Sequence, residues 1–346
     1  MARGGSPSDW QRPTSADVAR LAGVSPTTVS LVLSGKSTRI SEATKARVFE
    51  AVQTLGYRPN RAAQGLRRGR SSTIGLITDQ IAAEAFSGPI VSGAHDTVWD
   101  RGQMMLIVNA TLNARRIETA VENLLDQQVD AIIFATIGTR EVRLPSLIHR
   151  VPTVTVNSFS RDRDLPAVVP DEWSGGRAVV EHLLGLGHRR ITMLAGVRSA
   201  WATGVRVRAA RQALQAAGIR PDPTRLMYGN YRFDSGYELA LKAMAMTPRP
   251  TALLCGNDQM AAGAYLVLAR LGLRVPEDVS VAGYDDEPLA GFLTPGLTSV
   301  TLPFYELGQR GAALLLDAKG PLAPTTQMVD CPVVVRGSTA PPSYRS

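Results

Sequence analysis

The sequence has little cysteine, little histidine and no long apolar run. Only two of its 346 residues are cysteine and four are histidine. Cys255 and Cys331 lie in apolar contexts, so we expect buried, reduced thiols rather than a disulfide framework. The histidines lack metal-ligand spacing, so no metal site is predicted. No apolar stretch is long enough to cross a bilayer, which argues against a membrane protein.

Catalytic and export motifs are missing as well. There is no phosphate-binding glycine loop ending in Lys-Ser/Thr, and no G-x-S-x-G turn around a nucleophilic serine. The sequence therefore predicts no catalytic residues and no cofactor, and it disfavours an α/β enzyme such as a sugar kinase or a dehydrogenase. Residues 1–13 are polar and lack the apolar centre of an export signal, so we expect a disordered leader and a cytoplasmic protein.

The positive charge is concentrated near the start of the chain. The formal net charge is +8, and the first 73 residues hold 12 Lys or Arg against 4 Asp or Glu. The remainder holds 26 of each sign. Such a basic segment favours nucleic acid as its partner, and an anionic membrane surface is the weaker alternative.

Residues 14–58 predict three short helices. Thr14 or Ser15 can cap the first helix, Ser25 the second and Ser41 the third, while Gly23 allows a sharp turn between the first two. This spacing is typical of a helix–turn–helix, although an ordinary helical hairpin would look similar. If the unit binds DNA, its second helix offers the following side chains to a major groove: Pro26, Thr27, Ser30 and Leu31.

Residues 59–72 contain a short apolar segment among arginines. Asn60 can cap a short helix, and Leu66 would then be an exposed apolar side chain. Such a side chain can insert between base steps from the minor groove while arginines hold phosphates. A flexible basic linker is the alternative for this stretch.

From Thr73 onward, short β-rich runs alternate with helical patterns. This alternation predicts an α/β fold with parallel sheets covered by helices, either as two doubly wound lobes or as one barrel. Ligands of open parallel sheets bind at the carboxyl ends of the strands. That rule selects Asn109, Asn157 and Asp258 as ligand-binding candidates, with Arg206 and Tyr231 from neighbouring elements. Asp258 could equally be a helix cap.

Several motifs resemble one family of bacterial transcription regulators. They are "SADVARLAGVSPTTVSLVLSG", "EHLLGLGHRRITMLAG", "LLCGNDQMAAGA" and "GLRVPEDVSVAGYDDEPLA". They closely resemble the lactose-repressor (LacI/GalR) family. The resemblance implies a helix–turn–helix headpiece, a hinge helix and a two-lobed core similar to periplasmic sugar-binding proteins, which disfavours a barrel. The implied boundaries are 14–58 for the headpiece, 59–72 for the hinge and 73–340 for the core. The N-lobe would span about 73–165 and 296–328, and the C-lobe about 166–295 and 329–340.

The resemblance also implies site residues. Thr14, Ser25, Thr27, Ser30, Ser41 and Asn60 fall where the family contacts DNA, and Ala63, Gln64 and Leu66 fall on the hinge helix, with Leu66 as the minor-groove wedge. For the effector, the corresponding positions are Phe86, Asn157, Arg206, Tyr231, Asp258 and Phe304. Leu31 stands where many members have a base-reading arginine, and Glu172 replaces a frequent asparagine.

The expected function is therefore DNA-binding transcriptional regulation. We expect a homodimeric repressor of a carbohydrate-utilisation operon that binds near-palindromic double-stranded operator DNA. A mono- or oligosaccharide effector would bind between the lobes and control the affinity for DNA through allostery. A solute-binding protein without a regulatory role, or a sugar-processing enzyme, is the alternative. The missing apolar heptads predict that a helical tetramerisation tail is absent.

Overall fold

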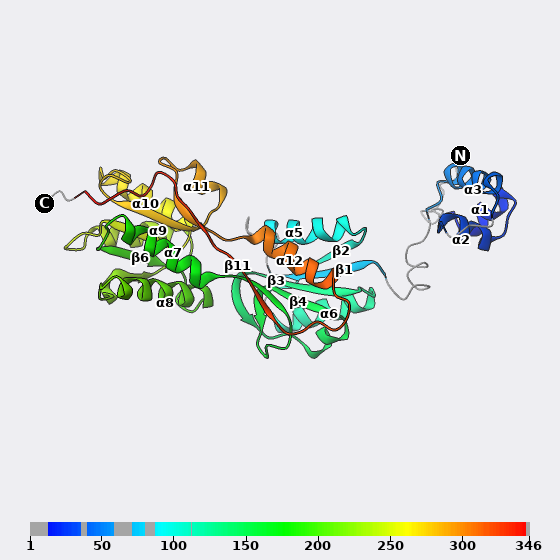
Figure 1. The fold of residues 1–346 in the computed structure, drawn as a ribbon, viewed down its shortest axis with the longest axis horizontal. Helices are drawn as coiled ribbons and strands as arrows, with labels where there is room; N and C mark the ends of the chain where they lie inside the picture. Colours follow the sequence, from blue (N-terminus) through cyan, green and yellow to red (C-terminus); the bar gives the residue numbers. More distant parts are fainter. Residues whose placement is uncertain (1–12, 36–39, 59–70, 80–86, 112, 344–346) are drawn as a thin grey trace, which may run out of the picture. The chain divides into compact units, whose positions relative to one another are not determined.

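The computed structural model describes residues 13–35, 40–58, 71–79, 87–111 and 113–343. The chain divides into two units, Met1–Ser71 and Ser72–Ser346. Figure 1 traces both units. Each unit is described separately below.

The first unit contains the three predicted helices: α1 (Ser15–Ala22), α2 (Pro26–Leu33) and α3 (Glu42–Leu55). The hydroxyl of Thr14 caps α1, and the Asp17 carboxylate accepts a hydrogen bond from the Thr14 backbone N–H in return. Gly23 ends α1 with a φ of 64°, a conformation that glycine adopts without strain. Apolar side chains of all three helices meet in one small core. The helix–turn–helix prediction is confirmed.

The second unit contains two six-stranded sheets, and the prediction of two doubly wound lobes is confirmed. The first sheet has the order β11-β5-β4-β3-β1-β2, and every pair in it is parallel. The second has the order β12-β10-β9-β8-β6-β7, and only β12 runs antiparallel to its neighbour. The strands of the first sheet are β1 (Thr73–Thr78), β2 (Met104–Asn109), β3 (Ala131–Val142), β4 (Thr153–Ser160), β5 (Ala167–Pro170) and β11 (Thr326–Val329). Those of the second are β6 (Ile191–Ala195), β7 (Leu226–Tyr228), β8 (Ala252–Cys255), β9 (Ser280–Asp285), β10 (Thr298–Thr301) and β12 (Val333–Val334).

Helices cover both faces of each sheet, and this creates four apolar cores. In the first lobe, α5 (Ser87–Asp100) and α12 (Phe304–Leu316) cover one face, and α6 (Ala114–Asp126) covers the other. In the second lobe, α7 (Glu172–Gly185) and α8 (Trp201–Ala216) cover one face. The opposite face carries α9 (Phe233–Met244), α10 (Asp258–Arg270) and the short α11 (Pro288–Phe292). Two 3-10 turns, Ser146–Arg150 and Pro223–Arg225, complete the elements.

The chain passes between the lobes three times, and two of these crossings differ from the predicted boundaries. β5 pairs with β4, so the first crossing follows Pro170 rather than lying near residue 165. β10 pairs with β9, so the second crossing lies between Thr301 and Phe304 rather than near 295. The third crossing falls between β11 and β12, close to the predicted position. Strand pairing decides these boundaries, and the alternation of elements along the sequence does not reveal it.

The contact between α5 and α12 depends on two glycines. A Cβ atom at Gly308 would collide with the backbone carbonyl of Ile90, and one at Gly93 would collide with the carbonyl of Tyr305. Backbone atoms cannot move aside as a flexible side chain can, so these glycines set how closely the two helices approach.

We therefore predict that Gly308→Ala lowers the free energy of unfolding by about 1–3 kcal/mol, because it forces α5 and α12 apart. Gly185→Ala at the end of α7 is the control, since no atom lies within 4 Å of the added Cβ there. Urea denaturation of both variants checks the prediction. Equal stability of the two variants would contradict the close helix contact.

Candidate functional site

The headpiece exposes one side of α2 and buries the other. Val29 and Val32 are buried in the small core, whereas Pro26, Thr27 and Leu31 are exposed. Ser25 caps α2 by accepting a hydrogen bond from the Thr28 N–H at 3.1 Å. The exposed start of a helix can donate backbone N–H groups and side-chain hydroxyls to a phosphate or a base edge.

The predicted DNA-binding residues of the headpiece lie at the starts of helices or on α2. Thr14, Ser25 and Ser41 are caps, Thr27 is exposed and Ser30 is half-buried. Asn60, Ala63, Gln64 and Leu66 lie outside the described residues, so the hinge helix and its wedge stay predictions. Apolar Leu31 is 41% exposed, so α2 presents an apolar side chain among hydroxyls.

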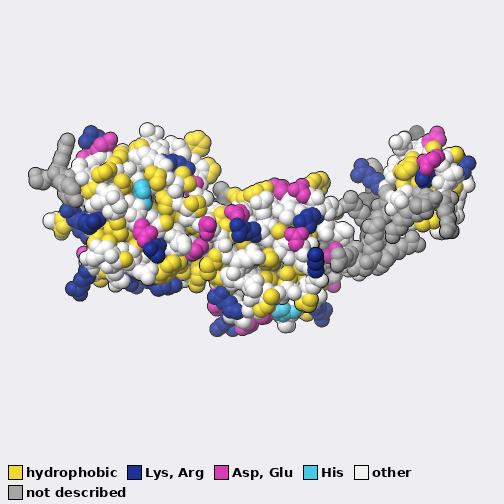
Figure 2. Space-filling view, viewed as in Figure 1, with side chains coloured by type: hydrophobic (Ala, Val, Ile, Leu, Met, Phe, Trp, Pro, Cys, Tyr) yellow, Lys and Arg dark blue, Asp and Glu magenta, His cyan; other side chains and the backbone are white. Residues whose placement is uncertain are grey.

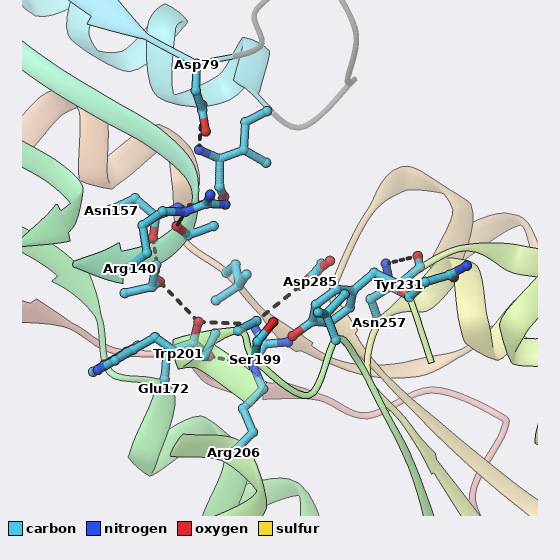
Figure 3. Close-up of a pocket in the computed structure, with 18 of the residues that line it drawn as sticks. Asp79, Arg140, Asn157, Glu172, Ser199, Trp201, Arg206, Tyr231, Asn257 and Asp285 are labelled. Atoms are coloured by element: carbon cyan, nitrogen blue, oxygen red, sulfur yellow. Dashed lines mark hydrogen bonds and ion pairs between the residues drawn. The ribbon is translucent and has the colours of Figure 1, made fainter. Parts of the chain in front are cut away.

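A cavity of about 760 Å³ lies between the two lobes of the core. Figure 3 shows its labelled side chains converging from both lobes. The first lobe and the crossing to α12 contribute Asp79, Ile137, Gly138, Thr139, Arg140, Glu141, Asn157, Leu302 and Phe304. The second lobe contributes Glu172, Val197, Ser199, Ala200, Trp201, Ala202, Arg206, Asn230, Tyr231, Arg232, Asn257, Gln259 and Asp285. The volume suits a ligand of small-molecule size.

Arg206 and Glu172 form a buried ion pair in the wall of this cavity. Arg206 Nε donates to Glu172 Oε2 at 2.6 Å, and Nη2 donates to Oε1 at 3.0 Å. Nη1 donates to the carbonyl oxygen of Gly256 at 2.9 Å. Burial alone would lower the pKa of Arg206, but the charge of Glu172 opposes it, and the pKa lies well above its usual value. Arg206 is therefore cationic and held in a fixed orientation.

Asp285 is the second acidic group near Arg206. Its carboxylate lies 3.8 Å from Arg206 Nη2. Burial raises the pKa of the Asp285 carboxyl well above its usual range, and the charge of Arg206 only partly opposes this. Because Glu172 already takes two donors of Arg206, the guanidinium cannot fully compensate Asp285 as well.

Asn157 holds a turn of the first lobe in place. Its amide nitrogen donates to the carbonyl oxygens of Thr136 and Ile137 at 2.9 and 2.7 Å. The Thr139 hydroxyl lies 2.6 Å from Asn157 Oδ1 and 3.2 Å from Glu172 Oε1. This hydroxyl therefore links the first lobe to the ion pair of the second, while the polar atoms of Asn157 are engaged within the protein.

Aromatic side chains form apolar parts of the wall. Trp201 packs edge-on against Phe159, with 5.2 Å between ring centroids. Tyr231 donates to or accepts from the Thr203 hydroxyl at 2.5 Å, which orients its ring. Phe304 lines the cavity at the crossing into α12. Aromatic faces beside polar groups are a combination that suits the C–H faces and hydroxyls of a sugar.

Three residues of the cavity wall have an uncommon backbone conformation. Asn157, Tyr231 and Asp285 have φ values of 54°, 66° and 96°, in the left-handed region that non-glycine residues seldom adopt. All three line the cavity. Strained residues of this kind cluster at ligand sites, where the surrounding structure holds them in place.

Four of the predicted effector residues line the cavity: Asn157, Arg206, Tyr231 and Phe304. Phe86 lies outside the described residues. Asp258 is fully buried and is not among the residues of the cavity wall, so its effector role stays a prediction. Its Oδ1 accepts from the Ser299 hydroxyl at 2.6 Å and its Oδ2 from the Glu287 N–H at 2.7 Å. Asp258 therefore connects the start of α10 to β10 and to the loop before α11, and its neighbours Asn257 and Gln259 line the cavity.

Asn109, the third strand-end candidate, is likewise not part of the wall.

Sequence reasoning missed several residues of the wall. Asp79 directly follows β1 and Asp285 ends β9, so the strand-end rule that selected Asn157 applies equally to both. Trp201 gives no such signal, because its place depends on how α8 packs against the first lobe. Glu172 is visible as an unusual acidic residue, but its pairing with Arg206 is not.

The described part of the chain shows no group of His, Cys, Asp and Glu that could hold a metal ion. Its helices also include none that is both long and apolar enough to span a bilayer.

Comparison with known proteins matches both units of the chain. The profile of bacterial regulatory proteins of the lacI family matches residues 14–60, and that of periplasmic binding protein-like domains matches residues 180–339. The HTH-type transcriptional repressor CytR of Escherichia coli is 32% identical over 94% of this chain and 96% of its own length. The chain belongs to the lacI family of bacterial regulatory proteins.

Solved structures support the same assignment. The lac repressor dimer bound to operator and the anti-inducer ONPF shares 29% identity, with a TM-score of 0.83 over 95% of this chain and all of that chain. The complex of the transcriptional regulator CelR with cellobiose shares 32% identity, with a TM-score of 0.67 over 94% of this chain and all of that chain. This lacI-family chain is thus a DNA-binding regulator and not an enzyme, as its sequence predicted.

The buried Asp258 makes a pH-dependent contribution to the stability of this regulator. Burial raises the pKa of its carboxyl to about 7 in the folded chain, and hydrogen bonds from Ser299 and Glu287 only partly oppose the shift. Ionisation of a raised-pKa acid disfavours the folded state. This cost is absent below about pH 4, grows between pH 4 and 7, and is complete above 7.

We predict that Asp258→Asn removes this cost, because an amide does not ionise; its oxygen can accept from the Glu287 N–H while its NH2 donates to the Ser299 hydroxyl. Relative to the variant, the wild type should lose up to about 4 kcal/mol of unfolding free energy as the pH rises from 4 to 8. Denaturant titrations at several pH values measure this difference, with exposed Asp162→Asn as the control. A difference that stays constant with pH would contradict the assignment.

Proposed function

We propose that this regulator represses a carbohydrate-utilisation operon and releases its operator when a sugar-like effector enters the cavity between the lobes. The observation that carries the proposal is the presence, in one chain, of a DNA-binding headpiece and a ligand-sized cavity built from both lobes of the core. The cellobiose complex of CelR adds support, because it is a similar regulator with a sugar bound. A solute-binding protein would have no use for the headpiece.

Operator recognition would use two copies of the headpiece. Ser25, Pro26, Thr27, Ser30 and Leu31 of α2 would enter the major groove, and the caps Thr14 and Ser41 would contact phosphates. The hinge residues Asn60, Ala63, Gln64 and Leu66 would bind the minor groove at the centre of the site. A twofold protein requires a near-palindromic site of double-stranded DNA.

Exposed apolar side chains support the homodimer. Trp99 of α5 is 67% exposed and Phe292 of α11 is 83% exposed. Further large apolar side chains are exposed in both lobes: Met104, Ile107, Leu241, Leu266 and Leu271. Figure 2 shows hydrophobic side chains on the visible surface of both lobes, mixed with charged ones. These side chains are available for contact with a second copy of the chain, and the similar lac repressor structure is a dimer.

Effector control would act through the arrangement of the lobes. A ligand that contacts Trp201 and Arg206 of one lobe and Asn157 of the other binds best to one arrangement, so it shifts the population toward that arrangement. The spacing of the two hinges in the dimer would follow, and with it the affinity for the operator.

Thr27→Ala tests the DNA interface. We expect the variant to lose 5- to 150-fold of its affinity for a site selected from random duplex DNA, since a specific base contact contributes about 1–3 kcal/mol. Gel-shift titration measures the loss, and Gln53→Ala on the exposed side of α3 is the control. If Thr27→Ala binds the selected site as tightly as the control, α2 does not read the groove.

Trp201→Ala tests the effector site. A neutral sugar that raises the melting temperature of the wild type should also weaken its binding to the operator. Trp201→Ala should need a sugar concentration about tenfold or more above that of the wild type for both effects. Thermal-shift and gel-shift titrations measure the two effects, starting with cellobiose and ribose. Trp173→Ala on α7 is the control, because Trp173 is partly exposed and does not line the cavity. Equal sugar requirements in the two variants would remove Trp201 from the site.

A further inference from the structure

The guanidinium of Arg206 is surrounded by groups of the protein itself. Glu172 binds it through two hydrogen bonds, and the carbonyl oxygen of Gly256 takes a third. The face of the guanidinium lies over the ring of Tyr284, with Cζ 3.5 Å from the ring centroid. Glu172 therefore occupies the Nε/Nη2 side of the guanidinium, where an anionic ligand could otherwise make a two-point contact, and one N–H on each Nη stays outside these three hydrogen bonds.

Glu172 is well placed to remain in this position. It is the first residue of α7, directly after the first crossing between the lobes. Its side chain is 1% exposed, and the Thr139 hydroxyl of the other lobe lies 3.2 Å from its Oε1. Figure 3 shows Glu172 beside Arg206, below Asn157 in the view. Leaving this site would break contacts to both lobes.

Two further cations, Arg140 and Arg232, line the cavity besides Arg206. Arg140 directs its Nε to the carbonyl of Gly138 at 3.0 Å. Burial raises the pKa of the nearby Asp79 carboxyl, and the charge of Arg140 only partly opposes this shift. Three carboxylates besides Glu172 line the cavity: Asp79, Glu141 and Asp285. The cavity therefore presents four acidic side chains against three arginines, Arg140, Arg206 and Arg232.

We propose that Glu172 acts as a built-in counter-anion that closes Arg206 to acidic ligands, so that the cavity selects an uncharged polyhydroxylated effector. A sugar phosphate or sugar acid would have to displace Glu172 to bind this side of Arg206, and its negative charge would then lie close to Asp285, whose carboxylate is 3.8 Å from Arg206 Nη2. Neutral hydroxyls can instead accept from the remaining N–H groups of Arg206 and donate to the carboxylates around it. The inference deepens the proposed function, since it names the chemical class of the effector.

Glu172→Ala tests this directly, with inorganic phosphate as the probe. Removal of the carboxylate leaves a buried cation and a space beside it, both facing the cavity, so phosphate should bind there. We expect phosphate at about ten times its dissociation constant to raise the melting temperature of Glu172→Ala by about 2 °C more than that of the wild type. Potassium chloride at equal ionic strength provides the salt reference.

Glu181→Ala is the matched control, because Glu181 lies on the same helix and pairs with Arg177 on the surface. General stabilisation by phosphate, and its binding to the basic headpiece, affect all three proteins equally. An identical phosphate response of Glu172→Ala and the control would overturn the proposal. The proposal would also be overturned if phosphate stabilised the wild type more than it stabilises Glu181→Ala and Glu172→Ala.

Loss of a buried counter-charge can prevent folding, and the experiment covers that case. If Glu172→Ala does not fold without phosphate, added phosphate should restore its folding, and Glu172→Ser, which also opens the space beside Arg206, should show the same rescue. Absence of rescue in both variants would contradict the proposal. The result does not depend on whether neutral sugars release the operator, so the two proposals can fail separately.

Discussion

A buried guanidinium must have its charge balanced, and the core of this regulator is arranged around that requirement. Arg206 is nearly inaccessible to water, so an unpaired cation there would destabilise the fold by several kcal/mol. Glu172 supplies the counter-charge from the first residue after a crossing between the lobes. The pair therefore forms where the two lobes meet and where a ligand would enter.

The same pair connects the cavity to the relative position of the lobes. Glu172 touches Arg206 of the second lobe and the Thr139 hydroxyl of the first, and Asn157 holds the turn that carries Thr139. A ligand that competes for any of these contacts changes the free energy of one lobe arrangement relative to another.

Signals from residues close together in the sequence predicted the fold well. The cavity wall was harder to predict, because it depends on contacts between residues far apart in the sequence. Thr14 and Ser25 indicate where two helices begin, and Gly23 indicates where the first helix ends, because caps and turns depend on a few adjacent residues. The expected effector roles of Arg206 and Tyr231 rest on family resemblance, and both residues line the cavity. Asp258 was selected by the same resemblance and the strand-end rule, but its hydrogen bonds to Ser299 and Glu287 could not be read from the sequence. Glu172 and Trp201 could not be assigned, because their partners lie 34 and 42 positions away along the chain.

The central claim is that one cavity and one DNA interface share a single equilibrium between lobe arrangements. The most direct test is whether sugar binding and operator binding affect each other equally. Calorimetry measures the affinity of a stabilising neutral sugar for the free dimer and for the dimer bound to a selected operator. The account predicts that operator weakens sugar binding by the same factor by which saturating sugar weakens operator binding. If the operator leaves the affinity for a sugar that fills the cavity unchanged, the shared equilibrium is contradicted.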